Sequence, residues 1–106
     1  MRLRLMTDYE CHAIWEILPD GVRNLSPRDL PISPGLAARI EEWQRAYDAT
    51  MVADDPAASG FASAEEERAF EATGRELWRA LQGELGPSHE VSYFSQTEGR
   101  ELTGLA

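Results

Sequence analysis

The chain contains no lysine, so all ten of its basic side chains are arginines. It has a single cysteine, Cys11, which excludes an intramolecular disulfide and fits a reducing compartment. No apolar run approaches the ~20 residues that span a bilayer, and residues 1–8 lack the apolar stretch of a signal peptide. From these absences we expect a cytoplasmic protein that does not contact membranes.

Motifs for catalysis and for cofactor binding are also missing. The sequence has no C-x-x-C, H-x-x-x-H or D-x-D-x-D-G pattern for a metal, and no glycine-rich loop for phosphate. Asp54 and Asp55 could hold a hard cation, but a solvated turn explains this pair as well. We therefore expect no cofactor, no metal ion and no enzymatic activity.

Cys11 and His12 form the one pair whose chemistry could be catalytic. A thiol beside an imidazole is typical of nucleophilic catalysis, but residues adjacent in sequence usually point apart, and a working pair meets through the fold. Ordinary packing is the competing interpretation. A small-ligand binder or an enzyme that uses Cys11, His12 or His89 stays an alternative, and the reactivity of the thiol would test it.

The charge balance is the strongest feature that the sequence does possess. Nineteen acidic side chains against ten basic ones give a formal net charge of −9 on 106 residues. Such a negative field repels nucleic acid and attracts basic protein surfaces. The length is typical of one domain with its own core.

Alternating and β-branched residues predict the strands. Residues 2–6 alternate with period two, and residues 91–94 are rich in β-branched and aromatic side chains. Residues 13–18 and 22–25 flank Pro19-Asp20-Gly21, a turn signal that predicts a hairpin. Residues 26–34 contain three prolines and predict an extended connector.

Two amphipathic helices are predicted in the middle of the chain. Ser33 and Pro34 are typical of a helix start, and its apolar stripe is Leu36, Ile40, Trp43, Tyr47 and Met51. The second helix begins at Ser63, where Glu66 would complete a capping box, and it ends at Gly86-Pro87. Its stripe is Phe70, Gly74, Leu77, Leu81 and Leu85, widened by Trp78.

These elements predict an α+β fold, with two amphipathic helices packed on one face of a small sheet of two to four strands. We expect the strand at 2–6 to lie beside the strand at 91–94. One α+β domain would span residues 1–94, and residues 95–106, which show no pattern for burial, would form a flexible C-terminal tail. The predicted core is Trp43, Tyr47, Phe70, Leu77, Trp78 and Leu81.

Several stretches of the chain resemble an uncharacterised family of small, acidic, single-domain bacterial proteins. They are Asp8-Tyr9-Glu10-Cys11-His12, Leu30-Pro31-Ile32-Ser33, Tyr47-Asp-Ala-Thr50, Asp54-Asp55-Pro56 and Ser59-Gly60-Phe61. The resemblance extends over most of the chain up to Phe94 and implies no catalytic residues. In size and charge the chain is also similar to toxin-neutralising immunity proteins.

We therefore predict a non-enzymatic acidic domain that binds a basic protein partner, as an immunity or antitoxin-type inhibitor does. The alternative is an orphan adaptor or regulatory subunit, which could be a homodimer. Arg68, Arg75 and Arg79 share one side of the second helix, as a docking line for an acidic partner or as a solvated face. The candidate partner-binding residues are Glu41, Glu42, Asp48, Asp54, Asp55 and Trp15.

Overall fold

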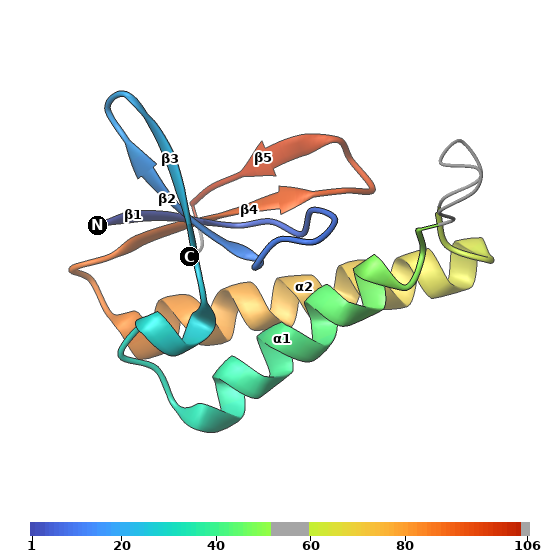
Figure 1. Ribbon diagram of the computed structural model, residues 1–106, viewed down its shortest axis with the longest axis horizontal. Helices are drawn as coiled ribbons and strands as arrows, with labels where there is room; N and C mark the ends of the chain where they lie inside the picture. The colour runs from blue at the N-terminus through green and yellow to red at the C-terminus, as the bar shows by residue number, and fades with distance from the viewer. Residues whose placement is uncertain (52–59, 105–106) are drawn as a thin grey trace.

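A five-stranded mixed sheet forms one layer of the molecule, and two helices form the other (Figure 1). The structure is a computed structural model that describes residues 1–51 and 60–104. The strand order is β3-β2-β1-β4-β5. The strands are β1 (Arg2–Leu5), β2 (Ile14–Leu18), β3 (Gly21–Leu25), β4 (Glu90–Ser95) and β5 (Arg100–Leu102).

The centre of the sheet joins the two ends of the chain. Strands β1 and β4 pair in parallel, with Leu3 opposite Val91 and Leu5 opposite Tyr93. These four side chains are buried because they all point toward the helices. Strands β2 and β3 form the predicted antiparallel hairpin, which pairs with β1 through β2. The predicted adjacency of residues 2–6 and 91–94 is therefore confirmed.

Both helices begin at the predicted caps. In α1 (Pro34–Asp48) the Ser33 hydroxyl accepts a hydrogen bond from the Leu36 N–H. In α2 (Ala64–Leu85) the Ser63 hydroxyl accepts one from the Glu66 N–H. The Glu66 carboxylate accepts from the Ala62 N–H, one residue before the position that a capping box requires.

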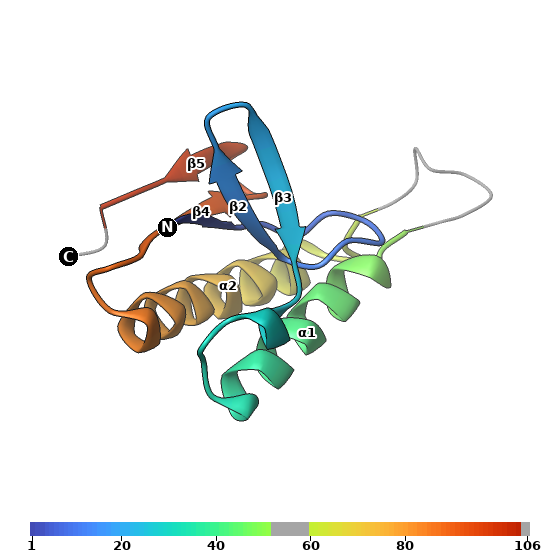
Figure 2. The same ribbon diagram turned by 60° about the vertical axis from the view of Figure 1, so that its left-hand side comes forward.

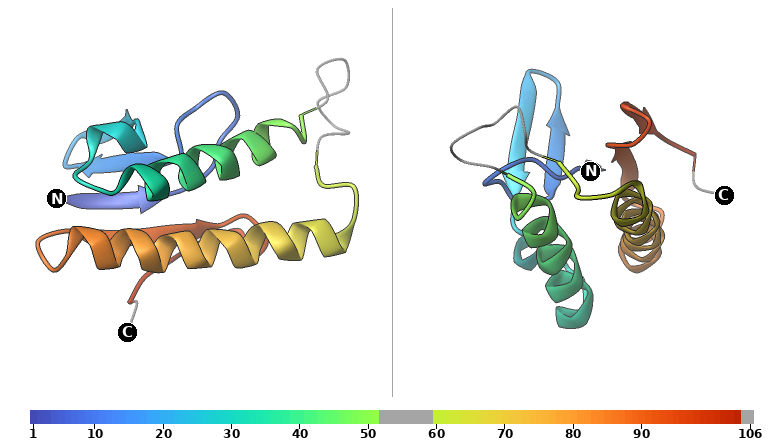
Figure 3. Two further views of the ribbon diagram at one scale, coloured as in Figure 1. Left: turned by 90° about the horizontal axis from the view of Figure 1, so that it is seen from below. Right: turned by 90° about the vertical axis from the view of Figure 1, so that its right-hand side faces the viewer.

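The helices cover one face of the sheet, α1 below β2 and β3 and α2 below β4 and β5 (Figures 2 and 3). Their stripes meet in one buried cluster with the sheet, in which Tyr47 is half-buried and the other predicted core residues are buried. Gly74 is needed there, because a Cβ at this position would lie 2.4 Å from the Tyr93 hydroxyl and 2.6 Å from the Trp43 ring. Gly86, with φ of 76°, ends α2 in a conformation that glycine adopts without strain.

The structure corrects three details of the prediction. The sheet has five strands instead of two to four, because Arg100–Leu102, inside the segment expected to be a tail, pairs with β4 as β5. The proline-rich connector is not extended throughout, since Pro27–Asp29 forms a 3-10 turn capped by Ser26. Helix α1 ends at Asp48, so Met51 lies beyond it and is 41% exposed.

Candidate functional site

A hollow of about 360 Å³ lies between one side of α1 and the loop that joins β1 to β2, residues 6–13. We call this hollow the acidic hollow, because three of its lining residues carry carboxylates. Its walls also include parts of the β2–β3 hairpin and of the 3-10 turn. The lining residues are Glu10, Cys11, His12, Ala13, Asn24, Pro27, Ile40, Glu41, Gln44, Arg45 and Asp48.

An aromatic stack attaches the middle of the 6–13 loop to α1. The Tyr9 ring stacks on the Tyr47 ring with 4.6 Å between centroids. The Tyr9 hydroxyl also shares a hydrogen bond of 2.8 Å with the Thr50 hydroxyl. Stacked aromatic pairs of this kind contribute about 0.5–1.5 kcal/mol beyond their buried area. The loop is thus attached near the C-terminal end of α1.

Polar side chains of α1 hold the backbone of the same loop. The Gln44 amide donates to the Asp8 carbonyl at 2.8 Å, and the Glu10 N–H donates to Asp48 Oδ1 at 2.9 Å. Glu10 adopts a φ of 60°, a left-handed conformation that is costly for a residue with a side chain. The bond to Asp48 helps to offset this cost, so the wall of the hollow is defined by specific contacts.

Glu41, Gln44 and Asp48 form a row along α1, because a spacing of three and four residues places side chains on one face of a helix. Glu41 Oε1 accepts two hydrogen bonds from the Arg28 guanidinium, at 3.2 and 2.8 Å. Asp48 Oδ1 accepts bonds from the Glu10 N–H and from the Gln44 amide. Among residues 1–51 and 60–104, Gln44 Oε1 is buried without any hydrogen-bond partner.

The electrostatic environment of Cys11 follows from this arrangement. Burial raises the pKa of the Cys11 thiol, and the nearby carboxylates of Asp8, Asp48 and Glu10 raise that pKa further. A nucleophilic cysteine needs the opposite, a positive environment that stabilises the thiolate. His12 is exposed. The surroundings of this pair therefore disfavour thiolate chemistry.

A second and more apolar hollow, of about 730 Å³, lies between the two helices near the C-terminal end of α1. The rings of Trp43, Phe61 and Phe70 line it, together with small side chains, and Glu42 stands in its wall. Trp43 and Phe70 stack with centroids 4.8 Å apart. We call it the apolar hollow. The adjacent residues Glu41 and Glu42 thus belong to different surfaces.

Trp15 lies on neither of these surfaces. In β2 it is paired with Arg4 of β1, on the sheet face turned away from the helices. Its ring is half-buried, and its Nε1 donates to the Met6 carbonyl at 3.0 Å. On the same face, Arg4 pairs with Glu101 of β5 at 2.6 Å. The indole is thereby fixed to the sheet.

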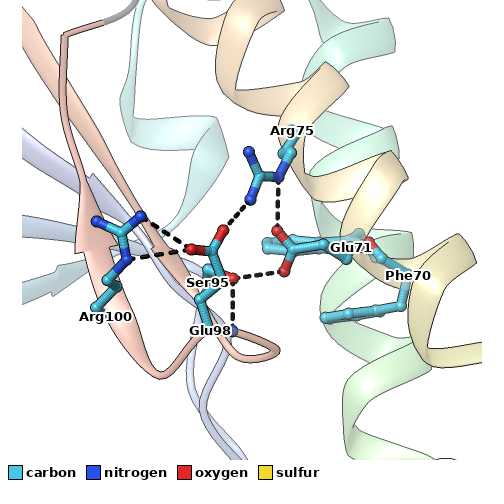
Figure 4. A network of polar contacts seen from close by, with 7 residues as sticks. Phe70, Glu71, Arg75, Ser95, Glu98 and Arg100 are labelled. Carbon is cyan, nitrogen blue, oxygen red and sulfur yellow. Dashed lines mark hydrogen bonds and ion pairs between the residues drawn. The ribbon is translucent and has the colours of Figure 1, made fainter. Parts of the chain in front are cut away.

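A polar network joins α2 to the turn between β4 and β5 (Figure 4). Glu71 accepts from Arg75 and from the Ser95 hydroxyl, and that hydroxyl accepts from the Glu98 N–H. Glu98 in turn accepts from both Arg75 and Arg100. Arg75, the central arginine of the basic strip formed by Arg68, Arg75 and Arg79, is therefore bonded within the molecule, which favours the interpretation of this strip as a solvated face.

Arg68 and Arg79, the other two arginines of that strip, are exposed on α2. Glu41 and Arg45 stand four residues apart on α1, yet Glu41 bonds to Arg28 of the 3-10 turn. Arg75 likewise bonds to Glu98, which lies outside its own helix. Spacing along a helix predicts neighbours within it but not partners from another element.

The predicted partner-binding residues do not form a single patch. Glu41 and Asp48 meet in the acidic hollow, while Glu42 and Trp15 lie elsewhere. Asp54 and Asp55 lie outside the described residues. Sequence reasoning missed Gln44 and Glu10, although the signal for Gln44 was present in its place between Glu41 and Asp48 on one helical face.

Two further properties of the described residues bear on function. Within residues 1–51 and 60–104, no group of three or more histidine, cysteine, aspartate or glutamate residues is arranged to hold a metal ion. Over the same part of the chain, none of the helices combines the length and the apolar character needed to cross a membrane.

Comparison with known proteins places the chain in a family. No curated protein gives a significant match. Residues 1–96 match the family described as Serratia CdiI immunity protein-like. This match extends from β1 through β4 and includes every residue that lines the acidic hollow. The chain therefore belongs to the Serratia CdiI immunity protein-like family.

Proposed function

We propose that this protein is a non-enzymatic immunity protein that neutralises a toxin by binding it. The observation that carries the proposal is the family match over residues 1–96, since the family is described by its immunity role. The net charge of −9 supports a partner with a basic surface. Binding would occlude the surface that the toxin needs for its own activity.

The contact surface in this proposal centres on the acidic side of α1. Glu41 and Asp48 are fixed there by hydrogen bonds, and fixed charges lose little side-chain entropy when a partner arrives. Long-range attraction from the whole charge would speed the encounter, and the local contacts would set the lifetime of the complex. Glu42, Asp54 and Asp55 would contribute to this attraction through the net charge of the chain, and not through contacts in the acidic hollow.

The test begins with a tagged pull-down from the source cell at low and high salt, followed by mass spectrometry. We expect one basic protein in near-stoichiometric amount, retained less well at high salt because exposed charges are screened. That protein is then expressed alone and together with this chain. Growth arrest that co-expression relieves would support the proposal, and a retained protein without toxicity would overturn the immunity role.

A further inference from the structure

The acceptor oxygens of the acidic hollow are only partly used. The bonds from Arg28 fall on Glu41 Oε1, and the bonds from Glu10 and Gln44 fall on Asp48 Oδ1. Within the described part of the chain, Glu41 Oε2 and Asp48 Oδ2 accept no hydrogen bond. Gln44 Oε1 is also without a partner there, and Gln44 is only 6% exposed.

A buried acceptor without a donor is costly, as is a carboxylate that is partly removed from water. Gln44 Oε1 is a buried acceptor of this kind, whereas Glu41 and Asp48 are half-buried carboxylates on the same side of α1. The hollow beside them, of about 360 Å³, leaves room for a donor group. One water needs only ~10–15 Å³ of such space. The arrangement is therefore able to accept a group that is larger than a water and rich in donors.

We propose that the acidic hollow receives an arginine side chain of the partner protein, whose guanidinium donates to Glu41, Gln44 and Asp48. This inference rests on the proposed function, because it names the group of the toxin that the site recognises. A guanidinium has five donors in a planar fork, which suits several acceptors along one wall. A lysine ammonium has three donors on a single nitrogen and matches such a row less well.

The charges around the hollow favour a cation. Burial is the main cause that raises the pKa of the Cys11 thiol, and the nearby negative charges of Asp8, Asp48 and Glu10 raise it further. Two basic groups lie nearby. Arg28 is already bonded to Glu41, and Arg45 is exposed on α1. The cationic centre of an incoming guanidinium would replace the solvent that now screens these carboxylates.

A small probe tests this inference without the partner protein. Nitrogen-15 NMR spectra are recorded on the full chain during titration with N-acetyl-arginine amide, with the isosteric neutral N-acetyl-citrulline amide, and with N-acetyl-lysine amide. We expect the arginine probe to shift the Gln44 side-chain amide and the Cys11 and His12 backbone amides, with little shift elsewhere. The citrulline probe should cause no such shifts, and the lysine probe should bind more weakly.

Charge-matched variants complete the test. The pair Glu41→Gln with Asp48→Asn should weaken binding of the arginine probe at least about tenfold, because two charge-assisted bonds become neutral ones. The pair Glu42→Gln with Glu76→Gln removes the same charge from other surfaces and should leave the affinity nearly unchanged. Both variants keep similar side-chain shapes, and their thermal unfolding is compared first.

Three results would overturn the inference. They are equal shifts with citrulline, lysine binding as tight as arginine binding, or equal loss of affinity in the two variants. The inference and the proposed function can also fail separately. If a toxin binds without contacts to Glu41 and Asp48, the arginine site is wrong and the immunity role stands. If the hollow binds arginine but the chain neutralises no toxin, the immunity role is wrong and the arginine site stands.

Discussion

The two hollows beside α1 share a helix but differ in how their walls are built. The apolar hollow is lined by stacked rings, with Trp43 only 4% exposed. The acidic hollow is lined by carboxylates and amides, with Gln44 held against the 6–13 loop. The first arrangement gains stability from packing, while the second leaves acceptors unused. The apolar side thus stabilises the fold, and the unused acceptors of the other side support the proposal that the acidic side binds the partner.

Truncating Trp43, whose ring belongs to the core and also lines the apolar hollow, should have the largest effect on stability. Trp43→Ala removes the stack on Phe70 and the bond of 3.1 Å from Nε1 to the Phe70 carbonyl. We expect a loss of about 3–5 kcal/mol in the free energy of unfolding, measured with urea. Glu42→Ala, at the next position along α1, is the control and should change that free energy little. Equal losses would contradict the assignment of this stability to the buried Trp43 ring.

Substitution of Gly74, which lies close to Tyr93 and Trp43, should have the next largest effect on the free energy of unfolding. A Cβ there would meet both Tyr93 and Trp43, so Gly74→Ala should lower the free energy of unfolding by about 1–3 kcal/mol. Tyr93→Phe removes the hydroxyl that lies nearest to the new Cβ. Adding it to Gly74→Ala should restore part of the loss in the same urea experiment. A tolerated Gly74→Ala would mean that the helix and the sheet are not packed this closely.

Changes in the acidic hollow should affect stability less than either core substitution. Glu41→Gln with Asp48→Asn keeps an acceptor at each position, so the bonds from Arg28 and from the Glu10 N–H can persist. We expect the free energy of unfolding to change by no more than about 1 kcal/mol. A loss as large as that of Trp43→Ala would show that these residues support the fold and are not reserved for binding.

The smallest predicted effect depends on pH. The hydrogen bond from Arg4 holds the pKa of Glu101 below its ordinary value of 4.5. A carboxylate whose pKa is lower in the folded state stabilises the fold at pH values above its unfolded-state pKa. This stabilisation is lost as the pH falls through the folded-state pKa. The free energy of unfolding should therefore decline below about pH 4.5, and Glu101→Gln should reduce this decline. Glu90→Gln, whose contact with Arg2 is 3.8 Å between exposed side chains, is the control.

Local patterns predicted most of the fold. The stripes from Leu36 to Trp43 and from Phe70 to Leu85 gave the buried faces of both helices, and Ser33 and Ser63 marked their starts. Strand β5 was missed because three residues with one half-buried apolar side chain, Leu102, carry little pattern of their own. It forms by pairing with β4, and that pairing is a tertiary property.

The candidate site could be predicted only in part. The acidic character of α1 was visible, since Glu41 and Asp48 were named from the sequence. Their separation from Glu42, and the role of Gln44, depend on the loop that packs against one side of the helix. The spacing places Gln44 on the same helical face as Glu41 and Asp48, but it contains no signal that the 6–13 loop packs there. Contacts between a helix and a loop with no periodic pattern are set by the whole fold.

The most direct test of the account is the dissociation constant of the complex with the protein retained in the pull-down, measured for three forms of the chain. These are the unmodified protein, the pair Glu41→Gln with Asp48→Asn, and the charge-matched pair Glu42→Gln with Glu76→Gln. We predict that the first pair weakens binding at least about tenfold and the second pair much less. Equal weakening in both would show that total charge alone attracts the partner, and it would contradict a specific acidic site.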